Sequence, residues 1–235
     1  MIKNVYFNDV KTYDDLGLVF ITRSTALPEI KEHTVDIPLR DGVIDYSEVV
    51  TGRVQFNQRE VDMSFFVFDD YKKWQRIQSN IASELHGQTK KIVFDDEPDR
   101  FYEGRVTLSS DIRYKQRGVG TLDMKVKCKP FKYAVITTAE PWIWDSFNFE
   151  TGIIQELYDL EVNGTLDVKL YADRYSYDAL IVTTDSAMTM TFGEDTYSLT
   201  SGDNEMLDIS LTEGENTLTF TGSGKVTINY RGGIL

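Results

Sequence analysis

The sequence predicts a mainly β protein with one clear helix, divided into two domains. Short runs of alternating apolar and polar residues recur along the chain, which is typical of half-buried strands. Only residues 70–86 repeat apolar side chains at helical spacing. Residues 1–135 carry 21 Lys+Arg and 21 Asp+Glu, whereas residues 136–235 carry 4 and 17, so the second part holds the entire net charge of −13. This asymmetry predicts domains at 1–135 and 136–235.

The helix over residues 70–86 has a start signal, an apolar stripe and a stop signal. Asp69 or Asp70 can cap its first turn, and Gly87 suits the left-handed residue after its end. We expect His86 to interact with the negative end of the helix dipole. The stripe that should face the core consists of Tyr71, Trp74, Ile77, Ile81 and Leu85.

The remaining elements of the first domain read as strands and turns. Residues 61–67 alternate, and residues 91–108 read as two strands around an acidic turn. Leu39-Arg40-Asp41-Gly42 is a turn signal, because glycine accepts a positive φ. Residues 111–120 read as a polar connection into a strand that ends near Cys128, whose thiol we expect in the core.

The second domain reads as β structure throughout. Alternating runs at 166–170, 188–192, 218–220 and 226–230 are separated by glycine-containing turns. Short strands with frequent turn signals predict an antiparallel β-sandwich or jelly roll.

The sequence contains few residues of the types that catalysis or metal binding usually requires. One cysteine and two histidines, His33 and His86, do not suggest a zinc site, and no nucleophile-elbow, metalloprotease or phosphate-loop motif is present. We therefore expect no enzyme activity, no metal and no cofactor. Carboxylates are plentiful, so a hydrolytic acid–base pair stays open as a minor alternative.

Macromolecular ligands are constrained in the same way. The acidic second domain disfavours specific nucleic-acid binding, which depends on Lys and Arg. No segment approaches the roughly 18 apolar residues of a membrane span, so we expect no membrane partner and synthesis in the cytoplasm.

A tyrosine cluster offers a second hypothesis. Tyr171, Tyr175 and Tyr177 lie beside Asp173 and Asp178, and aromatic rings can stack on sugar faces. The cluster is a candidate outer binding surface of a carbohydrate-binding sandwich. The alternative is that half of these rings pack into the core.

Two stretches resemble the distal tail protein family of siphophages, the phages with long flexible tails. The first runs from Ile37-Pro38-Leu39-Arg40-Asp41-Gly42 through Asp45-Tyr46-Ser47 to Arg59-Glu60-Val61. The second covers residues 211–235, with its Gly-x-Asn turn and terminal Tyr230-Arg231. The junction at residues 129–133 is also similar, so the resemblance spans nearly the whole chain.

The resemblance implies a β-sandwich or split-barrel first domain with a helix, and a galectin-like second domain. It further implies a structural hub at the virion tail tip: a homohexameric ring, made by residues 1–135, that joins the tail tube protein to the tail-associated baseplate protein. A receptor-binding protein is a further expected partner, and Leu39, Arg40, Asp41 and Gly42 are candidate assembly contacts. We expect the acidic domains to project away from the ring axis, because like charges repel.

Three function classes follow. The first is the tail hub, the second is a carbohydrate-binding module that aids host adsorption, and the third is a cell-wall hydrolase.

Overall fold

The chain divides into two structural units that interleave in sequence. In the computed structural model, residues 4–49, 52–109, 111–142 and 152–235 are described. Unit 1 comprises Met1–Asp96, Tyr102–Lys132 and Leu235, and unit 2 comprises Glu97–Phe101 and Tyr133–Ile234. Five residues at the start of one long strand therefore belong to the second unit, a detail that charge asymmetry did not indicate.

Unit 1 is an antiparallel sheet with a helix on it. Its central strands lie in the order β8-β10-β6-β3, with β9 on β10, β7 on β8, and β1 between β7 and β2. The elements are β1 (Val5–Phe7), β2 (Val10–Lys11), β3 (Leu18–Thr25), β4 (Thr34–Asp36), β5 (Val43–Asp45), β6 (Arg59–Phe68), the 3-10 turn η1 (Tyr71–Lys73), α1 (Trp74–Leu85), β7 (Thr89–Phe94), β8 (Glu97–Leu108), β9 (Arg113–Gln116) and β10 (Val119–Cys128).

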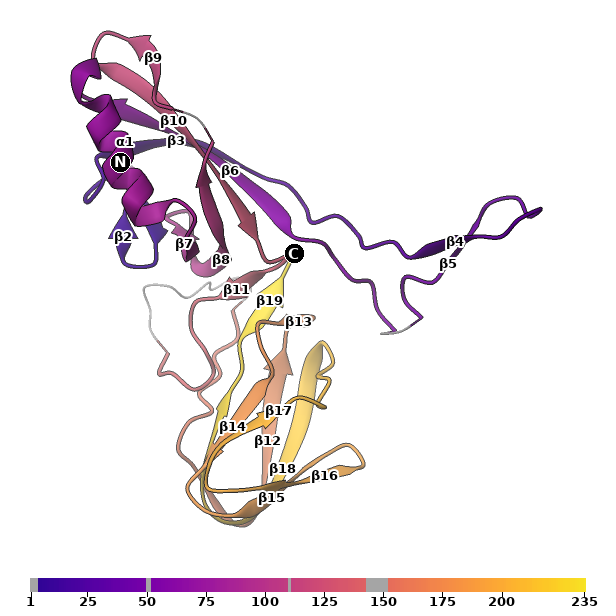
Figure 1. Cartoon of the computed structure of the whole chain (residues 1–235). Helices are drawn as coiled ribbons and strands as arrows, with labels where there is room; N and C mark the ends of the chain where they lie inside the picture. The colour runs from indigo at the N-terminus through magenta and orange to yellow at the C-terminus, as the bar shows by residue number, and fades with distance from the viewer. Residues whose placement is uncertain (1–3, 50–51, 110, 143–151) are drawn as a thin grey trace. The chain divides into compact units, whose positions relative to one another are not determined.

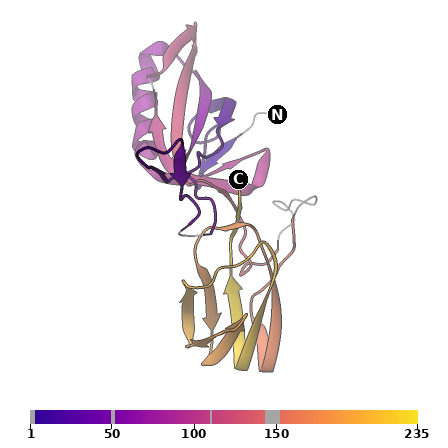
Figure 2. The same ribbon diagram turned by 90° about the vertical axis from the view of Figure 1, so that its right-hand side faces the viewer.

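The core of unit 1 lies between this sheet and α1, which runs along one face of the sheet (Figure 2). Strands β6 and β10 pair with Phe65 opposite Leu122, and both side chains are buried. Trp74 and Leu85 contribute the helix face of the core. A fully buried side chain of this size contributes about 2 kcal/mol.

The expected helix is present, with two differences. Asp70 accepts a hydrogen bond from the Lys72 amide at 3.1 Å, and Gly87 has φ +78°. Tyr71, however, lies in η1 before the regular helix and is exposed, so it does not join the apolar stripe. His86 caps the end of the helix, but its Nδ1 accepts from the Leu108 amide of β8 at 3.1 Å, a contact with the sheet that the helix pattern did not indicate.

Residues 111–120 differ from the polar connection that we expected. Arg113–Gln116 form strand β9, which pairs with β10 through Tyr114 opposite Gly120. All four β9 residues are exposed, so the strand shows no apolar alternation that a sequence could reveal. Cys128 is fully buried, as expected.

In the described residues of unit 2 the regular structure is all β, with a sheet in the order β16-β15-β18-β14-β17 and β12 also on β18. Strand β19 links β13 to β11, which pairs with the first residues of β8. The bounds are β11 (Lys132–Ala134), β12 (Leu160–Ala172), β13 (Tyr175–Ser176), β14 (Leu180–Thr184), β15 (Met188–Phe192), β16 (Asp195–Leu199), β17 (Gly202–Met206), β18 (Gly214–Asn229) and β19 (Gly232–Ile234). The mainly β, antiparallel fold with one helix is confirmed (Figure 1).

Two turns of unit 2 share the pattern Thr-x-Gly-x-Asn and the same hydrogen bonds. In residues 212–216, Asn216 Oδ1 accepts from the Thr212 amide at 3.0 Å, and Asn216 Nδ2 donates to the carbonyls of Thr212 and Gly214 at 2.8 and 3.0 Å. In residues 200–204, Asn204 makes the equivalent three bonds at 2.9, 2.8 and 3.0 Å. One amide side chain thus closes each turn that leads into β17 and β18.

Candidate functional site

The most prominent exposed feature of unit 1 is an arm, defined here as residues 26–58, that leaves the sheet between β3 and β6 (Figure 1). Near its base, Ile30 bridges to Phe56, and the Phe56 ring packs edge-on against Phe131 with centroids 5.7 Å apart. Farther out, β4 and β5 pair antiparallel with Val35 opposite Ile44. In its described residues, 26–49 and 52–58, the arm is therefore a two-stranded ribbon with few buried side chains.

A polar cluster beyond β5 fixes the register of the ribbon. The Ser47 amide donates to Asp45 Oδ1 at 2.8 Å, and Ser47 Oγ accepts from the His33 amide at 2.8 Å. The Tyr46 amide donates to the His33 carbonyl at 2.7 Å. Hydrogen bonds from Ser47 lower the pKa of Asp45, so its carboxylate stays ionised as an acceptor. This is the Asp-x-Ser element on which the family resemblance partly depends.

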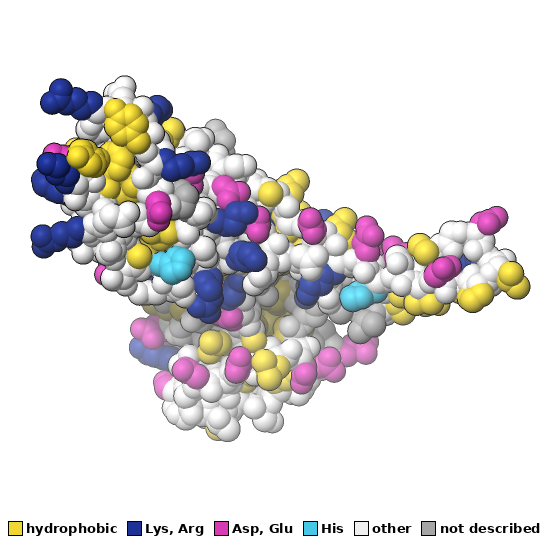
Figure 3. Space-filling model, turned by 45° about the horizontal axis from the view of Figure 1, so that its top comes forward, with side chains coloured by type: hydrophobic (Ala, Val, Ile, Leu, Met, Phe, Trp, Pro, Cys, Tyr) yellow, Lys and Arg dark blue, Asp and Glu magenta, His cyan; other side chains and the backbone are white. Residues whose placement is uncertain are grey.

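The arm exposes apolar side chains along its length. Figure 3 shows several of them, in yellow, toward the end of the arm. Large exposed hydrophobic residues of the arm are Leu27, Ile30, Val35, Ile37, Leu39, Val43, Tyr46 and Val49. Exposed apolar side chains gathered on one segment often mark contacts with another molecule.

Leu39, Arg40, Asp41 and Gly42 lie at the tip of this arm, between β4 and β5. Leu39 is fully exposed, and both Leu39 and Gly42 have positive φ, at 70° and 76°. Among the described residues, neither Arg40 nor Asp41 forms an ion pair. The tip thus presents one leucine, one cation and one anion to solvent.

The three tyrosines do not form one surface. Tyr171 is exposed, but Tyr175 is 9% exposed, which contradicts its expected outer position. Tyr177 packs edge-on against the rings of Tyr133 and Phe101, with centroids 4.9 and 5.6 Å apart. Their alternation along the chain was not a guide, because Tyr175 lies in β13, which pairs with the glycines of β19.

Unit 2 also contains a cavity of about 190 Å³, lined by residues of that unit alone. We call it the sandwich pocket. The apolar or aromatic part of its lining includes Trp142, Tyr171, Ile153 and Ile154. The Gln155 side chain bonds the Tyr171 backbone on both sides, donating to its carbonyl at 2.8 Å and accepting from its amide at 2.7 Å. This clamp holds residues 152–155 against β12.

Other residues that line the sandwich pocket are charged. Arg100 Nη1 donates to Asp173 Oδ2 at 3.1 Å, and Arg100 Nε lies 3.7 Å from Asp99 Oδ2. Glu140 Oε2 accepts from the Thr137 amide at 3.0 Å. The Asp173 carboxylate occupies the space where a side chain at Gly232 would begin, since an added Cβ there would lie 2.2 Å from Asp173 Oδ2.

Sequence reasoning missed most of this pocket. Arg100, Glu140, Trp142 and Asp173 are far apart in sequence and show no shared spacing. Only the tyrosine cluster pointed toward the region, through Tyr171. Residues 143–151, which include part of the aromatic-rich stretch noted in the sequence, lie outside the described residues.

The described residues give no sign of a metal or membrane site. In the described ranges, no group of three or more His, Cys, Asp or Glu side chains is arranged to hold a metal ion. Within the same ranges, no helix has the length and apolar character that crossing a membrane requires.

Comparison with known proteins decides the family. Residues 9–128 match the family described as phage tail protein RIFT-related domain. The chain belongs to this family. This phage tail protein has no match among curated proteins. Its matched region contains the arm and nearly all of the unit 1 sheet.

Seven chains of solved structures match this phage tail protein. One is the crystal structure of the Dit protein (gp 19.1) of phage SPP1, described as a paradigm of hub adsorption apparatus in phages that infect Gram-positive bacteria. The TM-score is 0.63 at 16% identity, over 100% of both chains. The resemblance to siphophage distal tail proteins is therefore confirmed at the level of family and fold.

Proposed function

We propose that the chain is the structural hub of a long, flexible phage tail tip. In this proposal, six copies form a closed ring through residues 1–135, and the ring joins the tail tube protein to the tail-associated baseplate protein. Its site of action is the virion, at the tail tip. Membership of the phage tail family and the fold shared with a hub protein support this function.

The arm is the observation that carries the proposal of self-assembly. It combines an ordered backbone with uncovered apolar side chains, a combination that fits a segment which packs on a neighbouring copy. Head-to-tail contacts between identical subunits close into a ring when the rotation allows it. The tip residues Leu39, Arg40, Asp41 and Gly42 are then contacts to a neighbouring subunit or to the tube protein.

The uneven distribution of charge is consistent with ring formation by residues 1–135 and an outward position of residues 136–235. Residues 136–235 carry the whole net charge of −13, so six copies crowded at the axis would repel one another. We propose that these acidic domains project outward, where salt screens them over about 8–10 Å. A receptor-binding protein would then meet the ring from outside.

The test measures assembly of the full chain. Light scattering at high protein concentration should give the mass of a hexamer, and negative-stain images should show rings. Val35→Glu and Val43→Glu place charges on exposed arm positions, so both variants should fold normally but lose the hexamer.

Leu207→Glu is the matched control, since Leu207 is similarly exposed but lies in unit 2. It should leave assembly unchanged. A full chain that stays monomeric at every concentration, or arm variants that assemble as the wild type does, would contradict the proposal. A ring with the acidic domains lining its lumen would contradict the outward orientation alone.

A further inference from the structure

The sandwich pocket has the composition of a small-ligand site. Its lining includes the aromatic residues Trp142 and Tyr171 together with Arg100 and two aspartates. Ligand sites typically combine apolar and aromatic lining with a few fixed polar groups. The polar groups here are held in place: Arg100 by Asp173, and Tyr171 by the bond from its hydroxyl to Glu215 Oε2 at 2.7 Å.

The charge of the pocket argues against an anionic ligand. Three carboxylates, from Asp99, Glu140 and Asp173, face one guanidinium, from Arg100. A phosphate or a carboxylate would meet this excess of negative charge.

The charges are also poorly arranged for a cation. Arg100 bonds Asp173 and approaches Asp99, and the Glu140 carboxylate accepts a backbone N–H. Each carboxylate therefore already has a positive or N–H partner. What remains is a mixture of hydrogen-bond donors and acceptors. Among the described residues, Arg100 makes only one side-chain hydrogen bond with its five N–H groups.

A neutral polyhydroxyl ligand matches this mixture. Each hydroxyl can both donate to a carboxylate oxygen and accept from a guanidinium N–H. The C–H face of a sugar ring is apolar and packs on aromatic rings, as Trp142 and Tyr171 would allow. Ile153 and Ile154, which are both exposed, add further apolar side chains to the lining.

We infer that the sandwich pocket binds a neutral saccharide unit, with its apolar ring face on Trp142 and Tyr171 and its hydroxyls on Arg100, Asp99 and Asp173. This site differs from the predicted platform, because it uses Tyr171 alone of the three tyrosines. The inference does not depend on ring formation, since every lining residue belongs to unit 2 of one chain.

The test is ligand-observed NMR on the full chain with methyl glucoside, methyl galactoside, rhamnose, N-acetylglucosamine and lactose. At least one sugar should bind with a dissociation constant on the order of 1 mM, the range accessible to a ligand of about a dozen non-hydrogen atoms. Trp142→Ala and Tyr171→Ala should each weaken that binding at least about tenfold. Arg100→Lys keeps the charge beside Asp173 but removes the planar fork, and should also weaken binding.

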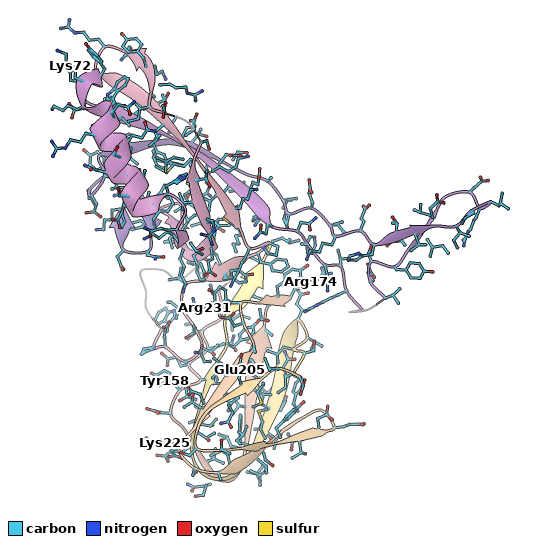
Figure 4. The ribbon with its side chains drawn as sticks, viewed as in Figure 1. Lys72, Tyr158, Arg174, Glu205, Lys225 and Arg231 are labelled. Atoms are coloured by element: carbon cyan, nitrogen blue, oxygen red, sulfur yellow. The ribbon has the colours of Figure 1, made fainter. Side chains whose placement is uncertain are left out.

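Tyr158→Ala is the matched control, because Tyr158 is a partly exposed aromatic of the same unit that does not line the pocket (Figure 4). It should bind the sugar as the wild type does. Glu140→Gln removes a charge but keeps a hydrogen-bonding oxygen, and it distinguishes a sugar from a cation in the competition experiment below. Circular dichroism on every variant excludes misfolding as the cause of a loss.

Three results would overturn the inference. No saturable binding of any sugar in the panel would reject the ligand class. Equal binding by the wild type, Trp142→Ala and Tyr171→Ala would place the sugar elsewhere. Displacement of the sugar by guanidinium chloride at matched ionic strength, abolished in Glu140→Gln, would identify a cation pocket. The ring assay reports separately on the hub, so failure of one proposal leaves the other intact.

Discussion

Gly104 lies in β8 directly against the backbone of β10, and replacing it with alanine should be costly. In β8 it pairs with Cys128 of β10. An added Cβ would lie 2.4 Å from the Lys127 carbonyl oxygen and 2.6 Å from the Cys128 Cα, both backbone atoms. Real Cβ atoms essentially never approach within 3.0 Å of such atoms. The two strands would have to separate by roughly half an ångström.

The cost of Gly104→Ala can be assembled from two contributions. Forcing one extra carbon into a packed interior typically costs about 1–3 kcal/mol. Lengthening one inter-strand hydrogen bond adds about 1 kcal/mol, the usual net contribution of such a bond. We therefore expect a loss of about 3 kcal/mol in the free energy of unfolding of unit 1.

Gly118→Ala is the matched control within the same unit. Gly118 has φ +75° and nothing within 4 Å of an added Cβ, so the penalty there is conformational only. A left-handed alanine costs about 1–2 kcal/mol, part of which is offset by a stiffer unfolded chain. The net loss should be about 1 kcal/mol.

The assay is urea unfolding of the full chain, with hydrogen exchange read from peptides of β6 and β10 so that unit 1 is followed alone. Gly104→Ala should lose roughly three times as much stability as Gly118→Ala. Equal losses in the two variants would refute the argument that backbone proximity, and not backbone conformation, requires glycine at 104.

Three further predictions concern single side chains. Burial raises the pKa of Cys128 to about 12 from an ordinary 9.0, so the thiol should resist alkylation at pH 8 in the native protein and react in urea; rapid labelling of the native protein would contradict this. The stability that the buried neutral thiol contributes should be full below pH 9.0 and lost as pH rises through about 12. Asn216→Ala should cost about 2–3 kcal/mol by calorimetry and Asn204→Ala less, because Asn216 is 4% exposed and leaves buried groups unpaired; equal losses would count against burial as the cause. Arg40→Ala should leave the melting temperature unchanged but weaken ring assembly in light scattering, and unaltered assembly would make the arm tip an ordinary turn.

Local sequence patterns predicted elements whose side chains are sorted by burial. In residues 74–85 and in β6, apolar residues repeat at the spacing of the face that is buried, so both elements were predicted. Strand β9 has no alternation of apolar and polar residues, because its four side chains are all exposed and it is held by pairing with β10. Tyr71 fits the helical spacing of the apolar residues, but it lies in the 3-10 turn before α1 and so does not share the buried face of the helix.

The candidate sites divide in a similar way. The Leu39–Gly42 turn was predicted because its conformational requirement is local, and glycine with a positive φ satisfies it. The sandwich pocket was not predicted, because strand pairing brings together residues near 100, 140, 155 and 173. No spacing rule connects those positions. Tyr175 was misplaced for the same reason, since its burial depends on β19, almost 60 residues farther along the chain.

The arm has a consequence for how tightly a ring would hold. In the proposed ring, a subunit whose arm packs on its neighbour would be held at two places if the body of unit 1 also contacts that neighbour. Once the first contact has formed, the arm is tethered at a local concentration in the millimolar range, so its own affinity can be weak. Either contact alone would release readily, whereas the two together would dissociate slowly. Such a ring would form only above a threshold protein concentration and would then persist on dilution.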